Sequence, residues 1–203
     1  MEDMTKVFAS AFKSKRLSYQ PIEDSDKEFM HRCLWSNPVQ MGLAVPFNLQ
    51  IHSRQVSDQQ VDGMMKHSAL AIMVLLPGEK KDGDKDEPEP ERVGFVTLRS
   101  GMPCRATSVS MAIADDYQGR GYGREALNWA LDWAFGYGDF HRVELTTGEY
   151  NDRAVHLYKS IGFVEEGRKR KAFLVNHKWW DTVEMGMLRE DYEKARSAQG
   201  QSS

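Results

Sequence analysis

Alternating apolar and polar residues predict a central strand in the second half of the chain. Val109, Met111 and Ile113 alternate with smaller or polar residues. This period of two is typical of a strand with one face in a core. Asn176 and His177 predict a hairpin turn between two late strands. The strands predicted in this way lie near residues 17–19, 70–76, 93–98, 108–114 and 142–146, and two late strands follow: one begins at 163–164 and leads to the hairpin arm at 173–179, and the last lies near 183–187.

Apolar residues at helical spacing predict four helices between these strands. Ser25 with Glu28, and Ser57 with Gln60, each fit a capping box at a helix start. The predicted helices run from Ser25 to about Asn37, from Ser57 through Met65, from beyond Gly123 to Gly136, and from Asn151 to Gly162. The order is therefore strand, two helices, three strands, helix, strand, helix and two strands, which predicts a mixed α/β fold.

A single domain covering residues 1–203 is expected from this length and from the lack of an internal repeat. Residues 1–14 and 194–203 are polar and are expected to be flexible tails. Residues 77–91 are rich in Glu, Asp, Lys, Gly and Pro and are expected to form a solvated loop.

The strongest local signal for function is the glycine-rich turn that follows the central strand. Gly119, Gly121 and Gly123 lack a Cβ, so they can take positive φ and direct their N–H groups at one point. A helix begins directly after the turn, and its positive N-terminus adds to the attraction for an anion. The turn therefore predicts a phosphate cradle.

Two familiar phosphate-binding motifs fit this turn poorly. A P-loop would place Lys and Ser or Thr after the last glycine, whereas Gly123 is followed by Arg124 and Glu125. The dinucleotide fingerprint fits better, since Glu144 lies at about the right separation for a ribose contact. It lacks the third glycine, because Arg124 occupies that place.

The segment from Gln118 to Gly123 resembles the Gln/Arg-x-x-Gly-x-Gly/Ala pyrophosphate loop of the GNAT superfamily of acetyl-CoA-dependent N-acetyltransferases. Residues 151–163 resemble the next motif of that family, an Asn-x-x-Ala-x-x-Leu-Tyr helix that closes with Gly-Phe. The resemblance covers about the last half of the chain, is nearest to the spermidine and ribosomal-protein types, and weakens before Val93. It implies a central, mostly antiparallel mixed sheet flanked by about four helices.

The resemblance also implies where acetyl-CoA, the cosubstrate, would bind. The pyrophosphate would lie on the amides of the glycine turn, and the pantetheine arm would hydrogen-bond the edge of the central strand as a short strand would. The residues expected to bind the cofactor are Met111, Ala112, Ile113, Gln118, Gly119, Arg120, Gly121, Tyr122, Gly123, Arg124, Asn151, Arg153 and Tyr158. Asn151 also fits a plain helix cap, and each arginine also fits an exposed residue without a ligand.

Transfer of an acetyl group to an amine needs a base for the ammonium and an acid for the departing thiolate. The resemblance implies that Tyr158 is the acid, because its phenol can donate a proton to sulfur. Thr146 stands where some ribosomal-protein types carry a glutamate, so the sequence does not decide which residue acts as the base. Glu149 is a weak first choice, and the alternatives are Glu144, His141, Glu23, His31 and a water chain.

The function expected is acetyl transfer from acetyl-CoA to a primary amine by direct attack. A catalytically silent acyl-CoA-binding module on the same fold is the alternative from another class. The sequence does not decide whether the acceptor is a polyamine, another small amine or a protein amine. It also does not decide whether the protein forms a homodimer. Met30, Met64 and Met65 fit either an acceptor groove or plain core.

Composition adds limits on partners and location. The net charge of −3 argues against a general nucleic-acid binder, and no apolar run is long enough to span a membrane. Cys33 and Cys104 are too few for a disulfide framework or a cysteine zinc site, so no metal is expected. Glu2 and Asp3 lie in a start without a long hydrophobic stretch, so no targeting peptide is expected. The expected location is the cytoplasm, with the nucleus as the alternative.

Overall fold

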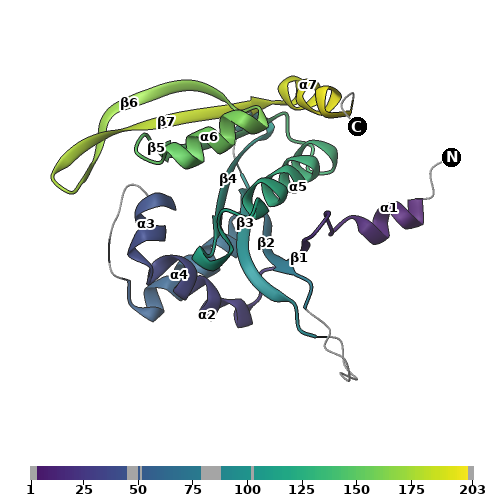
Figure 1. The fold of residues 1–203 in the computed structure, drawn as a ribbon, viewed down its shortest axis with the longest axis horizontal. Helices are drawn as coiled ribbons and strands as arrows, with labels where there is room; N and C mark the ends of the chain where they lie inside the picture. Colours follow the sequence, from purple (N-terminus) through teal and green to yellow (C-terminus); the bar gives the residue numbers. More distant parts are fainter. Residues whose placement is uncertain (1–3, 45–49, 51, 79–87, 102, 201–203) are drawn as a thin grey trace.

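A computed structural model describes residues 4–44, 50, 52–78, 88–101 and 103–200. The strands form one sheet in the order β1-β2-β3-β4-β5-β7-β6 (Figure 1). Each neighbouring pair is antiparallel except β4 with β5, which is parallel. The strands are β1 (Ser18–Pro21), β2 (Ser68–Leu76), β3 (Glu91–Arg99), β4 (Ala106–Ile113), β5 (Arg142–Gly148), β6 (Val164–Val175) and β7 (Lys178–Leu188). The predicted mixed, mostly antiparallel sheet is confirmed.

The helices cover both faces of the sheet. The α-helices are α1 (Met4–Ser10), α2 (Lys27–Met30), α3 (Pro38–Ala44), α4 (Arg54–Lys66), α5 (Tyr122–Gly136), α6 (Asp152–Ile161) and α7 (Arg189–Gly200), and α2 continues into a π-helical turn, His31–Trp35. Alternate residues of β2 separate the two cores. Ile72 and Val74 pack in the cluster that contains α5, whereas Met73 and Leu75 pack in the cluster that contains α2 and α4.

Several helix starts differ from the predicted ones. The first capping box uses Glu23 and Asp26 rather than Ser25 and Glu28, and α4 is capped by Ser53 rather than Ser57. Ser57 is buried and hydrogen-bonds His31 instead. The predictions failed because several Ser, Asp and Glu residues compete for each cap, and tertiary contacts decide among them.

Helical structure is also more extensive than the four predicted helices. The segment α3 forms where only an irregular stretch was expected, and α1 and α7 occupy much of the two expected tails. The segment α7 is held by its side chains, since Tyr192 donates a hydrogen bond to Asp132 of α5 at 2.8 Å. The expected solvated loop falls largely on residues 79–87, which lie outside the described residues.

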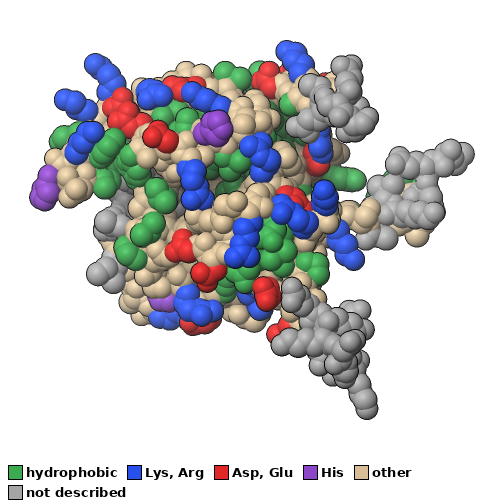
Figure 2. Space-filling model, in the orientation of Figure 1, with side chains coloured by type: hydrophobic (Ala, Val, Ile, Leu, Met, Phe, Trp, Pro, Cys, Tyr) green, Lys and Arg blue, Asp and Glu red, His purple; other side chains and the backbone are tan. Residues whose placement is uncertain are grey.

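The β6–β7 hairpin extends beyond the rest of the sheet (Figure 1). Its turn has Asn176 and His177 at positive φ, as the sequence predicts. Basic side chains gather over its far end (Figure 2), and the run from Arg168 to Lys171 of β6 is exposed. Within the described residues, no helix is long and apolar enough to cross a membrane.

Candidate active site

The central strands β4 and β5 separate after a short parallel contact. They pair only from Ala106 to Ser108 on β4 and from Arg142 to Glu144 on β5. Beyond Ser108 the edge of β4 that faces β5 has no strand partner, and a cavity of about 720 Å³ opens there. We call it the cofactor cavity. It is bounded by Val109, Ser110, Met111, Ala112 and Ile113 of β4, Leu145, Thr146 and Thr147 of β5, the glycine turn and α6.

The glycine turn forms one end of the cofactor cavity. Gly119 and Gly121 have φ of +74° and +84°, values that L side chains rarely adopt, and Gly121 directly precedes the first residue of α5. A Cβ built on Gly119 would meet no atom within 4 Å, so this glycine faces open space. Both glycines line the cofactor cavity beside the start of α5, where free backbone amides favour an anion such as a phosphate group.

Three polar side chains support this end of the cavity. Gln118 donates a hydrogen bond to the Ile113 carbonyl at 2.8 Å and accepts one from Arg153 at 2.9 Å. Arg124 donates to the Ser160 hydroxyl at 2.6 Å. Arg153 and Arg124 both line the cavity, whereas Arg120 lies over the Tyr117 ring and does not line it. The structure thus brings together every expected cofactor-binding residue except Arg120.

Arg16, which the sequence did not indicate, also reaches the glycine turn. Its guanidinium donates to the Arg120 carbonyl at 2.9 Å and to Glu125 at 2.7 Å, and it lies over the Tyr122 ring. Burial opposes ionisation of Glu125, but the Arg16 amide, the Ser14 hydroxyl and the Arg16 guanidinium outweigh it and lower the pKa of this carboxyl. The Arg16–Glu125 pair therefore fastens the segment before β1 to the first turn of α5.

Asn151 caps α6 and also joins it to α3. Its carbonyl oxygen accepts from the Ala154 amide at 3.2 Å, and its amide nitrogen donates to the Leu43 carbonyl at 3.2 Å. Beside it, the Tyr150 hydroxyl donates to the Gly42 carbonyl. Both residues line the cofactor cavity, so α3 closes one side of the cavity through these contacts.

Tyr158 projects from α6 into the same cavity. Its ring packs edge-on against Phe163 with centroids 5.9 Å apart, and burial raises the pKa of its phenol. Among the described residues none hydrogen-bonds its hydroxyl. The phenol is therefore protonated at neutral pH and has its proton available to a group in the cavity.

Glu149, the first choice for a base, lies outside the cavity lining. Its carboxylate accepts from the Asp181 amide at 3.1 Å and faces Arg168 at 3.6 Å, so it belongs to the β6–β7 hairpin contacts. Glu144 pairs with Arg142, and His31 pairs with Ser57. Glu149, Glu144 and His31 therefore each contact another protein residue, and none of the three lines the cofactor cavity.

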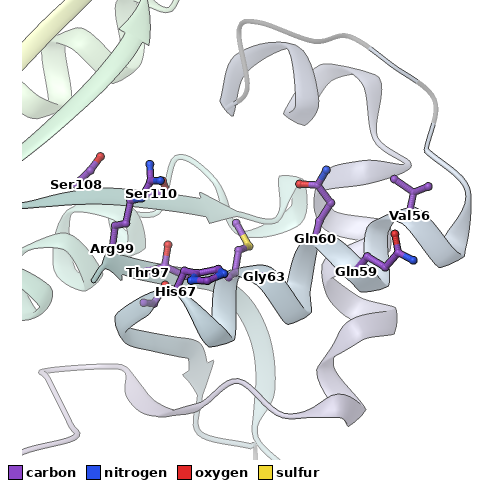
Figure 3. A pocket seen from close by; sticks show the side chains of 11 residues that line it. Val56, Gln59, Gln60, Gly63, His67, Thr97, Arg99, Ser108 and Ser110 are labelled. Atoms are coloured by element: carbon purple, nitrogen blue, oxygen red, sulfur yellow. The ribbon is translucent and has the colours of Figure 1, made fainter. Parts of the chain in front are cut away.

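A second cavity, of about 580 Å³, lies on the α4 side of the sheet (Figure 3). We call it the α4 cavity. Its lining comes from α4, from His67 directly after it, and from β2, β3 and β4: Val56, Gln59, Gln60, Gly63, Met64, His67, Ser68, Thr97, Arg99, Ser108 and Ser110. Met64 and Ser110 line both cavities, so the two cavities adjoin at these residues.

The α4 cavity takes its β4 residues from one face of that strand, whereas the cofactor cavity takes them from both faces. Met111 and Ile113 face α5, since a Cβ built on Gly123 would lie 3.6 Å from each. Ser110 points to the other face of the strand, the face it shares with Ala112, which packs in the α2–α4 core. Of the three methionines considered from the sequence, Met64 lines the cavities, while Met30 is fully buried core and Met65 packs at its edge.

This fold matches that of known acetyltransferases. Residues 77–163 match the sequence model of the acetyltransferase (GNAT) family. The fold agrees with the crystal structure of an acetyltransferase (GNAT family) from Bacillus anthracis, with a TM-score of 0.72 and 22% identity over 88% of this chain and 98% of that one. The chain therefore has the fold of the GNAT acetyltransferases, and the resemblance inferred from the two motifs is confirmed.

Two named relatives match part of the chain. A spermidine N(1)-acetyltransferase from Vibrio cholerae is 36% identical over 88 residues, which cover 43% of this chain and 51% of the relative. N-alpha-acetyltransferase RimI from Mycobacterium tuberculosis is 34% identical over 83 residues, which cover 41% and 50%. The chain thus spans about half the length of these relatives in the alignments.

A solved neighbour contains ligands. It is the spermidine N-acetyltransferase from Vibrio cholerae in complex with CoA and spermine, with a TM-score of 0.71 and 24% identity over 89% of this chain and 99% of that one. At this identity the likeness establishes the fold, and the activity of the present chain has to be argued from its own residues.

Proposed function

We propose that this protein is an acetyl-CoA-dependent N-acetyltransferase that acts on a primary amine. The observation that carries the proposal is the gap between β4 and β5, which joins the glycine turn, the free edge of β4 and Tyr158 in one cavity. Its volume of about 720 Å³ lies within the ~300–1,000 Å³ typical of small-molecule and cofactor sites.

The residues present suit coenzyme A. The glycine turn, which lacks side chains at Gly119 and Gly121, and the amides at the start of α5 would hold a diphosphate, and Arg124 and Arg153 line the same cavity. The free edge of β4 offers N–H and C=O groups to an arm that contains amide bonds. Bound acetyl-CoA would supply a thioester as the acetyl donor.

Tyr158 is the proposed general acid. Its raised pKa keeps the phenol protonated, and its hydroxyl has no partner among the described residues, so it can donate to the departing sulfur. We leave the base unassigned, because the carboxylates considered from the sequence lie away from the cavity. The amine acceptor would enter from the α4 cavity, which shares the lining residues Met64 and Ser110 with the cofactor cavity.

Replacing Tyr158 with Phe tests this role. The expected result is a fall in kcat of about 10²- to 10⁴-fold, the usual contribution of a general acid, with little change in acetyl-CoA affinity. Tyr137→Phe is the matched control, because Tyr137 is an exposed tyrosine outside both cavities. An unchanged kcat in Tyr158→Phe would remove this residue from the acid role.

Retained acetyl-CoA binding without amine-dependent turnover would instead favour the silent acyl-CoA-binding module. The polyamine alternative draws support from the relatives named as spermidine acetyltransferases. The charges of the residues that line the α4 cavity are relevant to whether a polyamine can be the acceptor.

A further inference from the structure

The α4 cavity differs from a polyamine site in the charge of its lining. Among the described lining residues there is no Asp, Glu or Lys, and Arg99 is the one group that carries a full charge at every physiological pH. The remaining polar groups are the amides of Gln59 and Gln60, the hydroxyls of Ser68, Thr97, Ser108 and Ser110, and the imidazole of His67.

The acids of α4 point away from this cavity and are already paired. Asp58 forms an ion pair with Arg54 at 2.7 Å, and Asp62 forms one with Lys27 at 2.6 Å. Asp58 and Asp62 are four residues apart and share one side of the helix, whereas the lining residues Gln60 and Met64 share another. Neither Asp58 nor Asp62 therefore contributes negative charge to the lining of the α4 cavity.

Arg99 is free to bind a ligand. It is exposed at the end of β3, and among the described residues no carboxylate pairs with its guanidinium. Thr97 and Arg99 alternate on one face of β3, and Thr97 lies opposite Ser110 on β4. Figure 3 shows Arg99 among the residues of the α4 cavity, whose lining also includes Ser110, a residue shared with the cofactor cavity.

From these observations we infer that the acceptor amine carries an anionic group, a carboxylate or a phosphate, which Arg99 binds. The guanidinium presents a planar set of donors that matches the oxygens of either anion. A polyamine would instead bring several ammonium groups to a cavity with a fixed positive charge and no acid to receive them. This inference rests on the proposed function, since it names the acceptor of that same site.

Matched acceptor pairs test the inference. Lysine and cadaverine share a primary amine and differ by a carboxylate, and O-phosphoethanolamine and ethanolamine differ by a phosphate. Spermidine represents the polyamines. Release of the coenzyme A thiol is measured for each compound with the wild type, Arg99→Gln, Arg99→Lys and the control Arg32→Gln, because Arg32 is exposed and outside both cavities.

The wild type is expected to favour the anionic member of at least one pair by about tenfold or more in kcat/KM. The pair that shows the preference identifies the anion as carboxylate or phosphate. Arg99→Gln should abolish the preference, Arg99→Lys should retain part of it, and Arg32→Gln should leave it intact. Melting temperature and acetyl-CoA affinity should be unchanged in all three variants, since each side chain is exposed.

Two results would overturn the inference while the proposed function stands. One is preferred turnover of spermidine, or of cadaverine and ethanolamine over their anionic partners, and the other is a preference that Arg99→Gln does not alter. Acetyl-CoA binding without turnover of any anionic amine would also overturn it. Absence of acetyl-CoA binding to the wild type would instead contradict the proposed function itself.

Discussion

Gly119→Ala separates the backbone role of the glycine turn from its role in binding. The residue has φ of +74°, so an alanine there is strained by about 1–2 kcal/mol. Gly101 offers a matched control, because it has the same φ of +74° and also faces open space, but it does not line either cavity. Gly101→Ala should therefore cost the same stability without touching the cradle.

The magnitudes follow from these facts. A chain of this size shifts its melting temperature by about 2–4 °C per kcal/mol, so both variants should melt about 2–8 °C below the wild type. Acetyl-CoA at about a hundred times its dissociation constant should stabilise the wild type and Gly101→Ala by about 2.7 kcal/mol. In Gly119→Ala the new Cβ occupies the hollow, and a tenfold loss of affinity alone would remove about 1.4 kcal/mol of that stabilisation.

The assay is thermal unfolding with and without acetyl-CoA, with NAD and ATP as comparison ligands. The reasoning predicts equal melting temperatures for the two variants without ligand and a smaller acetyl-CoA shift in Gly119→Ala only. An acetyl-CoA shift of the same size in both variants would refute the assignment of the turn as the phosphate cradle.

Three further positions, Gly121, Asn151 and Glu125, are tested by substitution. Gly121→Glu should abolish acetyl-CoA binding by filling the cradle with a negative charge, whereas Gly136→Glu at the end of α5 should leave it intact; calorimetry compares the two. Asn151→Ala should cost about 1 kcal/mol in denaturant unfolding through loss of the α6 cap, and Asn151→Asp should restore most of it. The lowered pKa of Glu125 stabilises the fold at neutral pH, and this contribution is lost as the pH falls below about 4, through the folded pKa. Glu125→Gln should therefore weaken the fall of the melting temperature at acid pH. A fall as large as that of the wild type would count against the Arg16 contact.

Most strands were predictable because their signal is local. The alternation around Val109 identifies β4, and the left-handed turn at Asn176 and His177 follows from residue type. The cap of α6 was also predictable, since Asn151 directly precedes a clear apolar stripe. Helix α3 and the cap Ser53 were missed because contacts distant in sequence decide them, such as the bond from Tyr150 to the Gly42 carbonyl.

The cofactor cavity was largely predictable, whereas the α4 cavity was not. The glycine turn and the α6 motif are each a continuous stretch of sequence, so their residues could be named in advance. The α4 cavity depends on how β3 pairs with β4 and on which side of α4 faces the sheet. A usable signal was present, because Thr97, Arg99, Ser108 and Ser110 place polar groups at alternate positions of otherwise apolar strands. Arg16 left no such signal, since only the fold brings it to Glu125.

The measurement that tests the central claim most directly is release of the coenzyme A thiol from acetyl-CoA, with and without a primary amine, together with mass analysis of the amine. The account predicts thiol release that depends on the amine, an equal amount of acetylated amine, and loss of both in Tyr158→Phe. Tight acetyl-CoA binding without amine-dependent release from any acceptor of the matched pairs or from spermidine would contradict it, and the protein would then be a silent acyl-CoA-binding module.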